Sequence, residues 1–404
     1  MGTEGTTRIE QALSTEEVAA ANRLTRRWFA SRADAPASVS ALGVWPLLTA
    51  LASGASRSTR SELLDAAGVG PADADDIAAR LLSAFRSAPA IRLAIGVWAG
   101  ARITLDPEWT AKLPGEAVGS LTGDRETDKA ALDAWAFRQT EGMIERMPLD
   151  FSRPVDLALA SALTVRTDWA TEFRDVPLRI ETGPWAGLGE VRALRCTIND
   201  DVLRVTDDVS VVTVPGRHDI DVLLALGREE FSAKQVLSTL FDAAEAPGWG
   251  RSAFADLAVG ETAPGVEVVE YEASEPQRRP EVGVQTVRFS VSSDLDLSED
   301  AAALGLARAC DFERSEFDRL AVPRTYISQA RQICTAEFSA AGFKAAAVTA
   351  MAMVRAASVV RPGNSQVRKR ASISIDRPFA YAARHRPSGL VLVAGWVDEP
   401  ERSF

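Results

Sequence analysis

The sequence has few of the residues from which most catalytic and metal sites are built. It contains three cysteines and two histidines among 404 residues. Cys196, Cys310 and Cys334 are widely spaced and form no Cys-x-x-Cys pair, so neither a disulfide framework nor a zinc site is indicated. His218 and His385 are the only imidazoles available as a metal ligand or general base. We therefore expect buried reduced thiols, no metal and no cofactor.

The motifs that hold nucleotides or activate a serine are missing as well. No Gly-x-x-x-x-Gly-Lys-Ser/Thr loop occurs, and Gly187-Leu188-Gly189 lacks the rest of a dinucleotide fingerprint. A Gly-x-Ser-x-Gly elbow is also absent. No apolar run reaches about eighteen residues, and the first ten residues contain no signal-peptide core. These absences predict a cytoplasmic protein that is not an enzyme and does not bind a membrane, and they leave secretion by another route open.

The chain has fewer basic than acidic side chains. The chain has 45 basic and 56 acidic side chains and a net charge of -11. Nucleic acids and anionic membranes select a basic face, so neither is an expected partner. Only five of the basic residues are lysine, and this arginine bias together with abundant alanine fits a GC-rich bacterial genome. With 46% hydrophobic and 25% charged residues, the composition is that of a soluble globular protein.

Local patterns place helices first along the chain and strands in its middle third. Ser14 followed by Glu16 and Glu17 predicts a helix N-terminus, because a serine caps the helix and acids suit its positive end. Alternating apolar residues and Val-rich runs predict strands. No repeat or linker forces a domain boundary, so we expect one mixed α and β domain. We expect helices over about 14–28, 45–53, 58–64, 72–87, 129–146 and 301–309, and strands over about 91–98, 156–165, 201–205, 209–214, 219–226 and 282–290.

The end of the chain carries a family resemblance. Arg377-Pro378-Phe379, then 384–389, then the apolar run 390–397 before Pro400, resembles the C-terminal signature of serpins. The stretches 157–173 and 54–62 are similar to serpin segments too, so the resemblance covers about 14–400. It implies an α+β serpin fold with N-terminal helices, a large central mixed or antiparallel sheet and further sheets. It also implies an exposed reactive-centre loop at about 340–372, after a flexible leader over 1–13.

The resemblance implies a function as a suicide substrate for a serine or cysteine protease, performed by a monomer. The protease cleaves the loop as an acyl-enzyme, and the loop then enters the central sheet as a new strand. At about 3.3 Å per residue, a dozen inserted residues carry the attached protease ~40 Å. The scissile bond is expected at Ala356-Ala357, which suits an elastase-like or subtilisin-like protease, or at Arg355, which suits a trypsin-like one.

The hinge that must insert first is rich in small residues. Strand side chains alternate between faces, so one face of the inserted strand would carry 343, 345, 347, 349, 351 and 353, and none of these is charged. The same segment is rich in good helix formers and also suits an exposed helix that never inserts. The predicted hinge residues are Gly342, Phe343, Lys344, Ala345, Ala346, Ala347, Val348 and Thr349.

Several positions depart from the inhibitory pattern. Phe343 stands where inhibitors carry Thr or Ser, and we expect its volume to overfill a gap shaped for a small side chain. Lys344 replaces a Glu, and Ala340-Ala341 replace the Glu expected before Gly342. The cluster that lets the sheet open is predicted to comprise Ser40, Gly43, Ser161 and Gln332, of which typical inhibitors have the last three as Ser, Asn and His.

These departures keep an alternative open, namely a non-inhibitory serpin-fold protein recruited for binding or specialised metabolism. The segment after the candidate bond is about ten residues longer than usual. Its basic run Arg368-Lys369-Arg370 is predicted to be a solvated loop, with a protease cleavage site or a contact for an acidic partner as functional interpretations.

Overall fold

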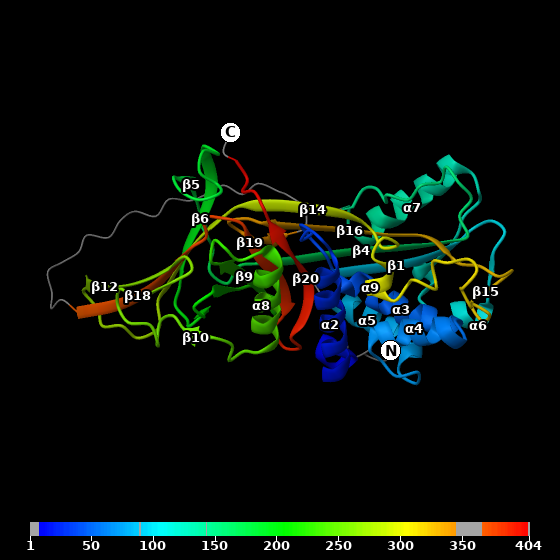
Figure 1. Ribbon diagram of the computed structural model, residues 1–404, viewed down its shortest axis with the longest axis horizontal. Coiled ribbons are helices and arrows are strands. Elements are labelled where there is room, and N and C mark those ends of the chain that lie inside the picture. Colours follow the sequence, from blue (N-terminus) through cyan, green and yellow to red (C-terminus); the bar gives the residue numbers. More distant parts are fainter. Residues whose placement is uncertain (1–7, 89, 143, 345–365, 403–404) are drawn as a thin grey trace, which may run out of the picture. The chain divides into compact units, whose positions relative to one another are not determined.

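The computed structural model describes residues 8–88, 90–142, 144–344 and 366–402 (Figure 1). The chain divides into two compact units, each made of three segments, where the sequence predicts one domain over 14–400. Unit 1 comprises Met1–Val165, Ser292–Thr335 and His385–Val393. Unit 2 comprises Arg166–Val291, Ala336–Arg384 and Ala394–Phe404. Both contain helices and strands, in agreement with the α+β class.

The helices of unit 1 confirm most of the predicted helical segments. Ser14 caps the second helix by accepting a hydrogen bond from the Glu17 amide at 3.2 Å. Residues 9–12, predicted as part of a flexible leader, form a short helix because Ile9 and Ala12 are buried. The helices are α1 Ile9–Ala12, α2 Thr15–Ser31, α3 Trp45–Gly54, α4 Arg57–Ala67, α5 Ala74–Ser87, α6 Pro107–Thr110, α7 Arg125–Gln139 and α9 Ala301–Leu304.

Two of the predicted helices have different bounds in the structure. The helix expected over 129–146 is α7, which starts earlier because Asp124 caps it and ends before Glu141 and Gly142, whose φ values are 54° and 82°. The helix expected over 301–309 stops at Leu304, because Gly305 adopts a left-handed conformation with φ 71°. Both corrections come from residues at the helix ends.

A sheet in unit 1 contains the strand pair that matters most for function. Strand β4 (Leu157–Asp168) is antiparallel to β1 (Ile91–Ala99) and parallel to β16 (Ile327–Phe338) through residues 327–334. The short β3 (Val118–Ser120) extends the sheet beyond β1, and β2 (Thr104–Leu105) pairs with β15 (Ala321–Val322). Strands β4, β14 (Phe289–Asp296), β16, β19 (Phe379–His385) and β20 (Leu390–Val397) contribute residues to both units.

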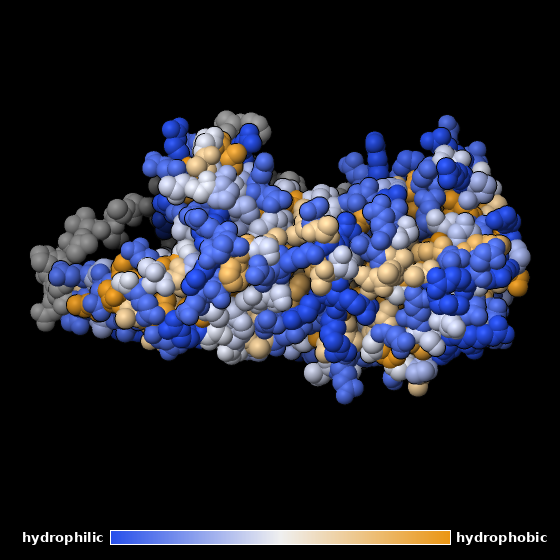
Figure 2. All heavy atoms as spheres, in the orientation of Figure 1, coloured by the Kyte–Doolittle hydropathy of each residue, from blue (hydrophilic) through white to orange (hydrophobic). Residues whose placement is uncertain are grey.

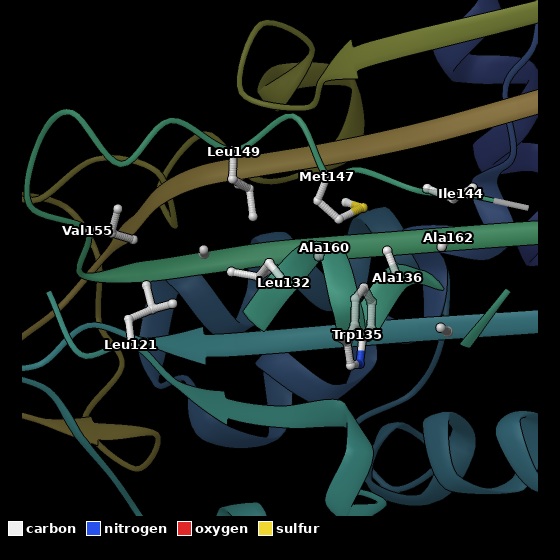
Figure 3. Packing of buried hydrophobic residues seen from close by; sticks show 12 residues of the cluster. Leu121, Leu132, Trp135, Ala136, Ile144, Met147, Leu149, Val155, Ala160 and Ala162 are labelled. Carbon is white, nitrogen blue, oxygen red and sulfur yellow. The ribbon is translucent and has the colours of Figure 1, made fainter. Parts of the chain in front are cut away.

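Helix α7 covers one face of this sheet. Leu132, Trp135 and Ala136 of the helix share a buried cluster with Ala158, Ala160 and Ala162 of β4. Figure 3 shows the three helix residues beside Ala160 and Ala162. Alanine at alternate positions of β4 leaves room for the helix to approach the strand. Other members of the same buried cluster are Ala94, Leu121, Ile144, Met147, Leu149 and Val155.

Two further sheets lie mainly in unit 2. One contains β10-β7-β8-β9-β19-β20 and the other β11-β12-β18-β13-β6-β5. The segment predicted as one strand over 282–290 is two, separated at Arg288, whose amide donates to the Arg192 carbonyl at 2.8 Å. Bounds are β5 Arg174–Arg179, β6 Glu190–Ile198, β7 Leu203–Val205, β8 Val209–Pro215, β9 Ile220–Gly227, α8 Ala233–Glu245, β10 Arg251–Ser252, β11 Thr262–Ala263, β12 Val266–Ala273, β13 Val282–Val287, β17 Gly342–Lys344, β18 Gln366–Ser374, β19 Phe379–His385 and β20 Leu390–Val397.

The segment predicted as the end of the reactive-centre loop is a strand in the structure. β18 is antiparallel to β12 and parallel to β13, so residues 366–372 are paired and not part of an open loop. The prediction that Arg368-Lys369-Arg370 form a solvated loop is therefore wrong. The positive charges suggested exposure to solvent, but these side chains have partners that come from distant parts of the sequence.

The surface in Figure 2 is mostly hydrophilic on the face shown. Within the described ranges, none of the helices is both long enough and apolar enough to cross a membrane.

Candidate functional site

The described part of the predicted hinge already forms a strand. In unit 2, β17 is antiparallel to β4 and also to β16, with Phe343 level with Thr167 on one side and Phe338 on the other. Gly342 is required by close approach, because a Cβ there would come within 2.3 Å of the Thr167 carbonyl oxygen. The hinge therefore begins between the two strands that a serpin loop must separate.

The side chain of Phe343 occupies a buried site. The steric overpacking that the sequence led us to expect at this position is not found. Its side chain is fully buried and its ring centroid lies 6.2 Å from that of Tyr381. Its neighbour Phe338 stacks on Phe289 at 5.5 Å and lies 4.5 Å from Trp169, centroid to centroid. The gap is shaped by aromatic side chains, so a large residue completes the packing there.

The turn that precedes the hinge is held by backbone hydrogen bonds. The Ser339 amide donates to the Gly342 carbonyl at 3.0 Å, and Trp169 donates from its indole nitrogen to the Ser339 carbonyl at 2.8 Å. The amides of Trp169 and Phe173 donate to the carbonyls of Ala341 and Ala340. These two alanines thus position the hinge without the carboxylate that the family pattern has before Gly342.

The structure brings together the four residues predicted as the sheet-opening cluster, all within unit 1. Gln332 Nε2 donates to the Ser40 carbonyl at 2.8 Å and to Ser161 Oγ at 3.2 Å, while its Oε1 accepts from the Ser40 amide at 3.1 Å. Ser40 Oγ donates to the Leu392 carbonyl at 2.6 Å. All of these side chains are buried, and their role in opening the sheet stays a prediction.

Gly43 contributes space to this cluster. A Cβ at this position would lie 2.4 Å from Gln332 Nε2 and 2.5 Å from Ser161 Oγ. The missing side chain at position 43 and the long amide at position 332 are therefore complementary. Gly43 and Gln332 look like two separate departures from the family pattern in the sequence. In the structure they are linked, because the side chain of Gln332 uses the space that the missing side chain at position 43 leaves.

The remaining predicted site residues lie outside the described residues. These are Ala345, Ala346, Ala347, Val348 and Thr349 of the hinge, and Arg355, Ala356 and Ala357 at the candidate bond. The backbone of Lys344 is described and pairs with Arg166 and Glu337.

The strand after the loop is fixed by a charge cluster that the sequence analysis missed. Glu281 accepts from Tyr271 Oη at 2.6 Å and from Arg370 Nε at 2.5 Å, and Arg368 lies 3.2 Å away. Burial raises the pKa of Glu281, but the hydrogen bonds from Tyr271 and Arg370 and the nearby positive charges outweigh it and lower that pKa. Glu281 and Arg370 are 89 residues apart, so no local pattern shows the contact.

Lys369, the middle residue of the basic run, is held separately. Its ammonium group donates to the Leu257 carbonyl at 2.6 Å and lies 5.7 Å from the ring centroid of Phe254. All three basic side chains of β18 thus contact other residues of unit 2, which anchors the C-terminal end of the loop.

The thiols predicted to be buried differ in their exposure, since Cys334 is buried whereas Cys196 and Cys310 are half-buried. Burial raises the pKa of all three to about 12. Over the described ranges, no group of three or more His, Cys, Asp or Glu side chains is placed to hold a metal ion. His385 Nδ1 lies 2.8 Å from Ser388 Oγ, within the turn between β19 and β20.

Comparison with known proteins places this geometry in a family. The sequence model of the serpin (serine protease inhibitor) family matches residues 17–182 and 267–400. Mouse neuroserpin is 22% identical over 291 residues, which are 67% of this chain and 61% of the relative. Rat glia-derived nexin is 27% identical over 114 residues, 28% of this chain and 26% of the relative. The chain therefore matches less than two thirds of the length of these relatives.

Solved structures show the same fold over nearly the whole chain. The thermophilic serpin tengpin in its native state has a TM-score of 0.69 at 17% identity, covering 95% of this chain and 94% of tengpin. Native protease nexin-1 with heparin has 0.68 at 18%, covering 96% and 100%. Human thyroxine-binding globulin with bound thyroxine has 0.68 at 17%, covering 96% and 98%. Because the family model matches well over half of its residues, this chain belongs to the serpin family.

Proposed function

We propose that this serpin inhibits a serine or cysteine protease as a suicide substrate, through loop cleavage and insertion between β4 and β16. The observation that carries the proposal is β17. Its residues pair with both flanking strands, so the first residues of the loop already occupy the insertion site. Continuing the strand requires the direct pairing of β4 with β16 to open further along.

The register of β17 predicts where the inserted residues would lie. Thr349 is six residues after Phe343, Ser161 is six before Thr167, and Gln332 is six before Phe338. An inserted strand would therefore bring Thr349 level with Ser161 and Gln332. The two ladders agree, because Ser161 and Gln332 are already paired with each other across β4 and β16.

Insertion along this register has a defined cost and a defined gain. It breaks the hydrogen bond between Gln332 and Ser161 and supplies the Thr349 hydroxyl, which both donates and accepts, in its place. Phe343 is buried, so the residues that share its face are those with odd numbers from 345 to 353. Because these residues carry no charge, their burial would leave no unpaired ion inside the protein.

A second candidate function is that of a non-inhibitory binding protein. Gln332 makes two hydrogen bonds to the Ser40 backbone besides its bond to Ser161, and Phe343 anchors the hinge in an aromatic core. Both features stabilise the sheet before any insertion. If they prevented insertion, a protease would cleave the loop as an ordinary substrate and would not be trapped.

A gel assay with three proteases separates the two functions. Incubation with trypsin-like, elastase-like and subtilisin-like proteases should give, with at least one of them, a covalent complex that survives SDS. Mass spectrometry of the released peptide should place the cleavage next to Arg355 or between Ala356 and Ala357. Cleavage in the loop by all three proteases with no complex would favour the binding protein. A monomeric state and a cytoplasmic location stay predictions from the sequence.

A further inference from the structure

A groove of about 790 Å³ lies on one sheet of unit 2. The strands that line it, β6, β13 and β18, follow one another in the sheet, and the turn between β11 and β12 forms a further wall. Gly283 and Ser372 form part of its floor, where a Cβ on Gly283 would come within 2.8 Å of the Ser372 hydroxyl. The volume falls within the range of small-molecule sites.

Two arginines are placed side by side along this groove without an acidic partner. Arg174 of β5 and Arg195 of β6 are directly opposite each other in the antiparallel ladder. Both are exposed, and neither forms an ion pair with any described residue. Like charges directly opposite on adjacent strands destabilise a sheet. An anion bound between the two guanidinium groups would remove that repulsion.

The polar network on the sheet orients one of these arginines. Arg195 donates from Nε to Gln285 Oε1 at 2.6 Å, and Gln285 donates from Nε2 to Ser374 Oγ at 2.7 Å. Nε is thereby occupied, while the two terminal nitrogens remain for a ligand. Such a fork matches the paired oxygens of a carboxylate or a phosphate.

The other lining groups define what the rest of the ligand must offer. Hydroxyl groups come from Thr197, Ser372 and Ser374, which both donate and accept hydrogen bonds. Glu172 and Glu267 also line the groove and accept hydrogen bonds only. A bare inorganic anion would satisfy the arginines and leave these groups to water. A ligand that also carries hydroxyl groups would satisfy both sets.

We propose that this groove binds a small hydroxylated organic anion, such as a sugar phosphate or a hydroxy acid, with its acidic group between Arg174 and Arg195. The ligand would touch β18 and the segment 171–174, and it would stabilise the folded state by mass action. Binding of the ligand does not require that the protein inhibit a protease.

Calorimetric titration of the full chain tests the proposal with four probes: ribose 5-phosphate, citrate, inorganic phosphate and neutral ribose. We expect ribose 5-phosphate or citrate to bind more tightly than inorganic phosphate, and ribose not to bind. Arg174→Met and Arg195→Met should each weaken binding at least about tenfold, the loss of a charged hydrogen-bonded contact. Arg278→Met is the matched control, because Arg278 is exposed in the same unit and does not line the groove.

Thermal unfolding without ligand gives a second measurement. Removing either groove arginine should leave the midpoint unchanged or raise it, since a repulsion is removed, and this also shows that the variants fold. The proposal is overturned if none of the three anions binds up to millimolar concentration. It is also overturned if both groove variants bind as tightly as Arg278→Met, or if inorganic phosphate binds as tightly as the hydroxylated anions.

Discussion

Gln332 donates a 3.2 Å hydrogen bond to Ser161, directly across the parallel strands β16 and β4. The two residues lie level with the position that Thr349 would take in an inserted strand, counted from the pairing of Phe343. This bond therefore closes the sheet at a point that the proposed mechanism must open.

Gly43→Ala should destabilise the intact protein by about 1–3 kcal/mol, because overpacking displaces side chains that cannot move freely. The added methyl group would lie 2.4 Å from Gln332 Nε2 and push the amide away from Ser161. Urea unfolding measures the change. Gly115→Ala is the matched control, since a Cβ on Gly115 meets no atom within 4 Å. Equal stability of the two variants would show that Gly43 is not needed for space.

Phe343→Ala should lower the free energy of unfolding by about 3–5 kcal/mol, the usual cost of emptying a buried aromatic site. The side chain is fully buried near Tyr381, so the cavity would form in the aromatic cluster. Phe137→Ala provides the control, because Phe137 is 52% exposed. If both variants lose the same stability, Phe343 does not anchor the hinge. Phe343→Thr restores a residue type that inhibitory serpins have at this position. It should also destabilise this protein, because it removes the same buried ring.

Glu281→Gln should flatten the dependence of stability on pH under acidic conditions. The pKa of Glu281 is lowered in the folded state, so its contribution is complete above the pKa of the unfolded chain and is lost as the pH falls through the folded pKa. Unfolding midpoints measured between about pH 5 and pH 3 should thus fall less in the variant than in the parent. Glu229→Gln, at an exposed position, should keep the slope of the parent. Identical slopes for all three proteins would contradict the account of β18.

The three cysteines should react slowly with a thiol reagent at pH 8 in the folded protein. Burial raises their pKa to about 12, so little thiolate is present. Absorbance after addition of an aromatic disulfide should show three thiols only when denaturant is added. Rapid labelling of Cys334, whose Sγ lies 3.0 Å from Ser38 Oγ, would show that unit 1 opens readily.

Thr349→Arg should convert an inhibitor into a substrate. In an inserted strand that continues the register of β17, position 349 would lie on the buried face at the level of Gln332, where an arginine would have no acidic partner among the described neighbours of the cluster. Asn364→Arg adds the same charge beyond the candidate bond and should leave complex formation intact. An SDS-stable complex formed equally well by both variants would exclude insertion in this register.

Family features and local periodicity predicted much of the fold. The capping of α2 by Ser14 and the strand β1 were predicted from neighbours in the sequence, and both were found, although burial along β1 does not follow the predicted alternation. The C-terminal segment that carries the serpin resemblance forms β19 and β20. By contrast, β18 was expected as a loop because the charges of Arg368 and Arg370 suggested exposure to solvent. Their partners Tyr271 and Glu281 approach only through the pairing of the sheet, so the sequence does not show these contacts.

The candidate site was predicted in its membership but not in its packing. Ser40, Ser161 and Gln332 were expected together and lie together. The volume exchange between Gly43 and Gln332 depends on three-dimensional distances of 2–3 Å, which no linear pattern contains. Phe343 was judged against a small residue in the family, whereas its fit depends on the shape of the surrounding aromatic rings.

The thermal unfolding of loop-cleaved protein, compared with intact protein, tests the central claim of insertion most directly. A new strand between β4 and β16 replaces their direct ladder with two ladders of hydrogen bonds and buries the odd-numbered side chains from 345 to 353. The account predicts that cleavage next to Arg355 or Ala356 raises the midpoint by more than about 10 °C, a gain of several kcal/mol for a chain of this size. An unchanged or lower midpoint after complete cleavage would contradict it.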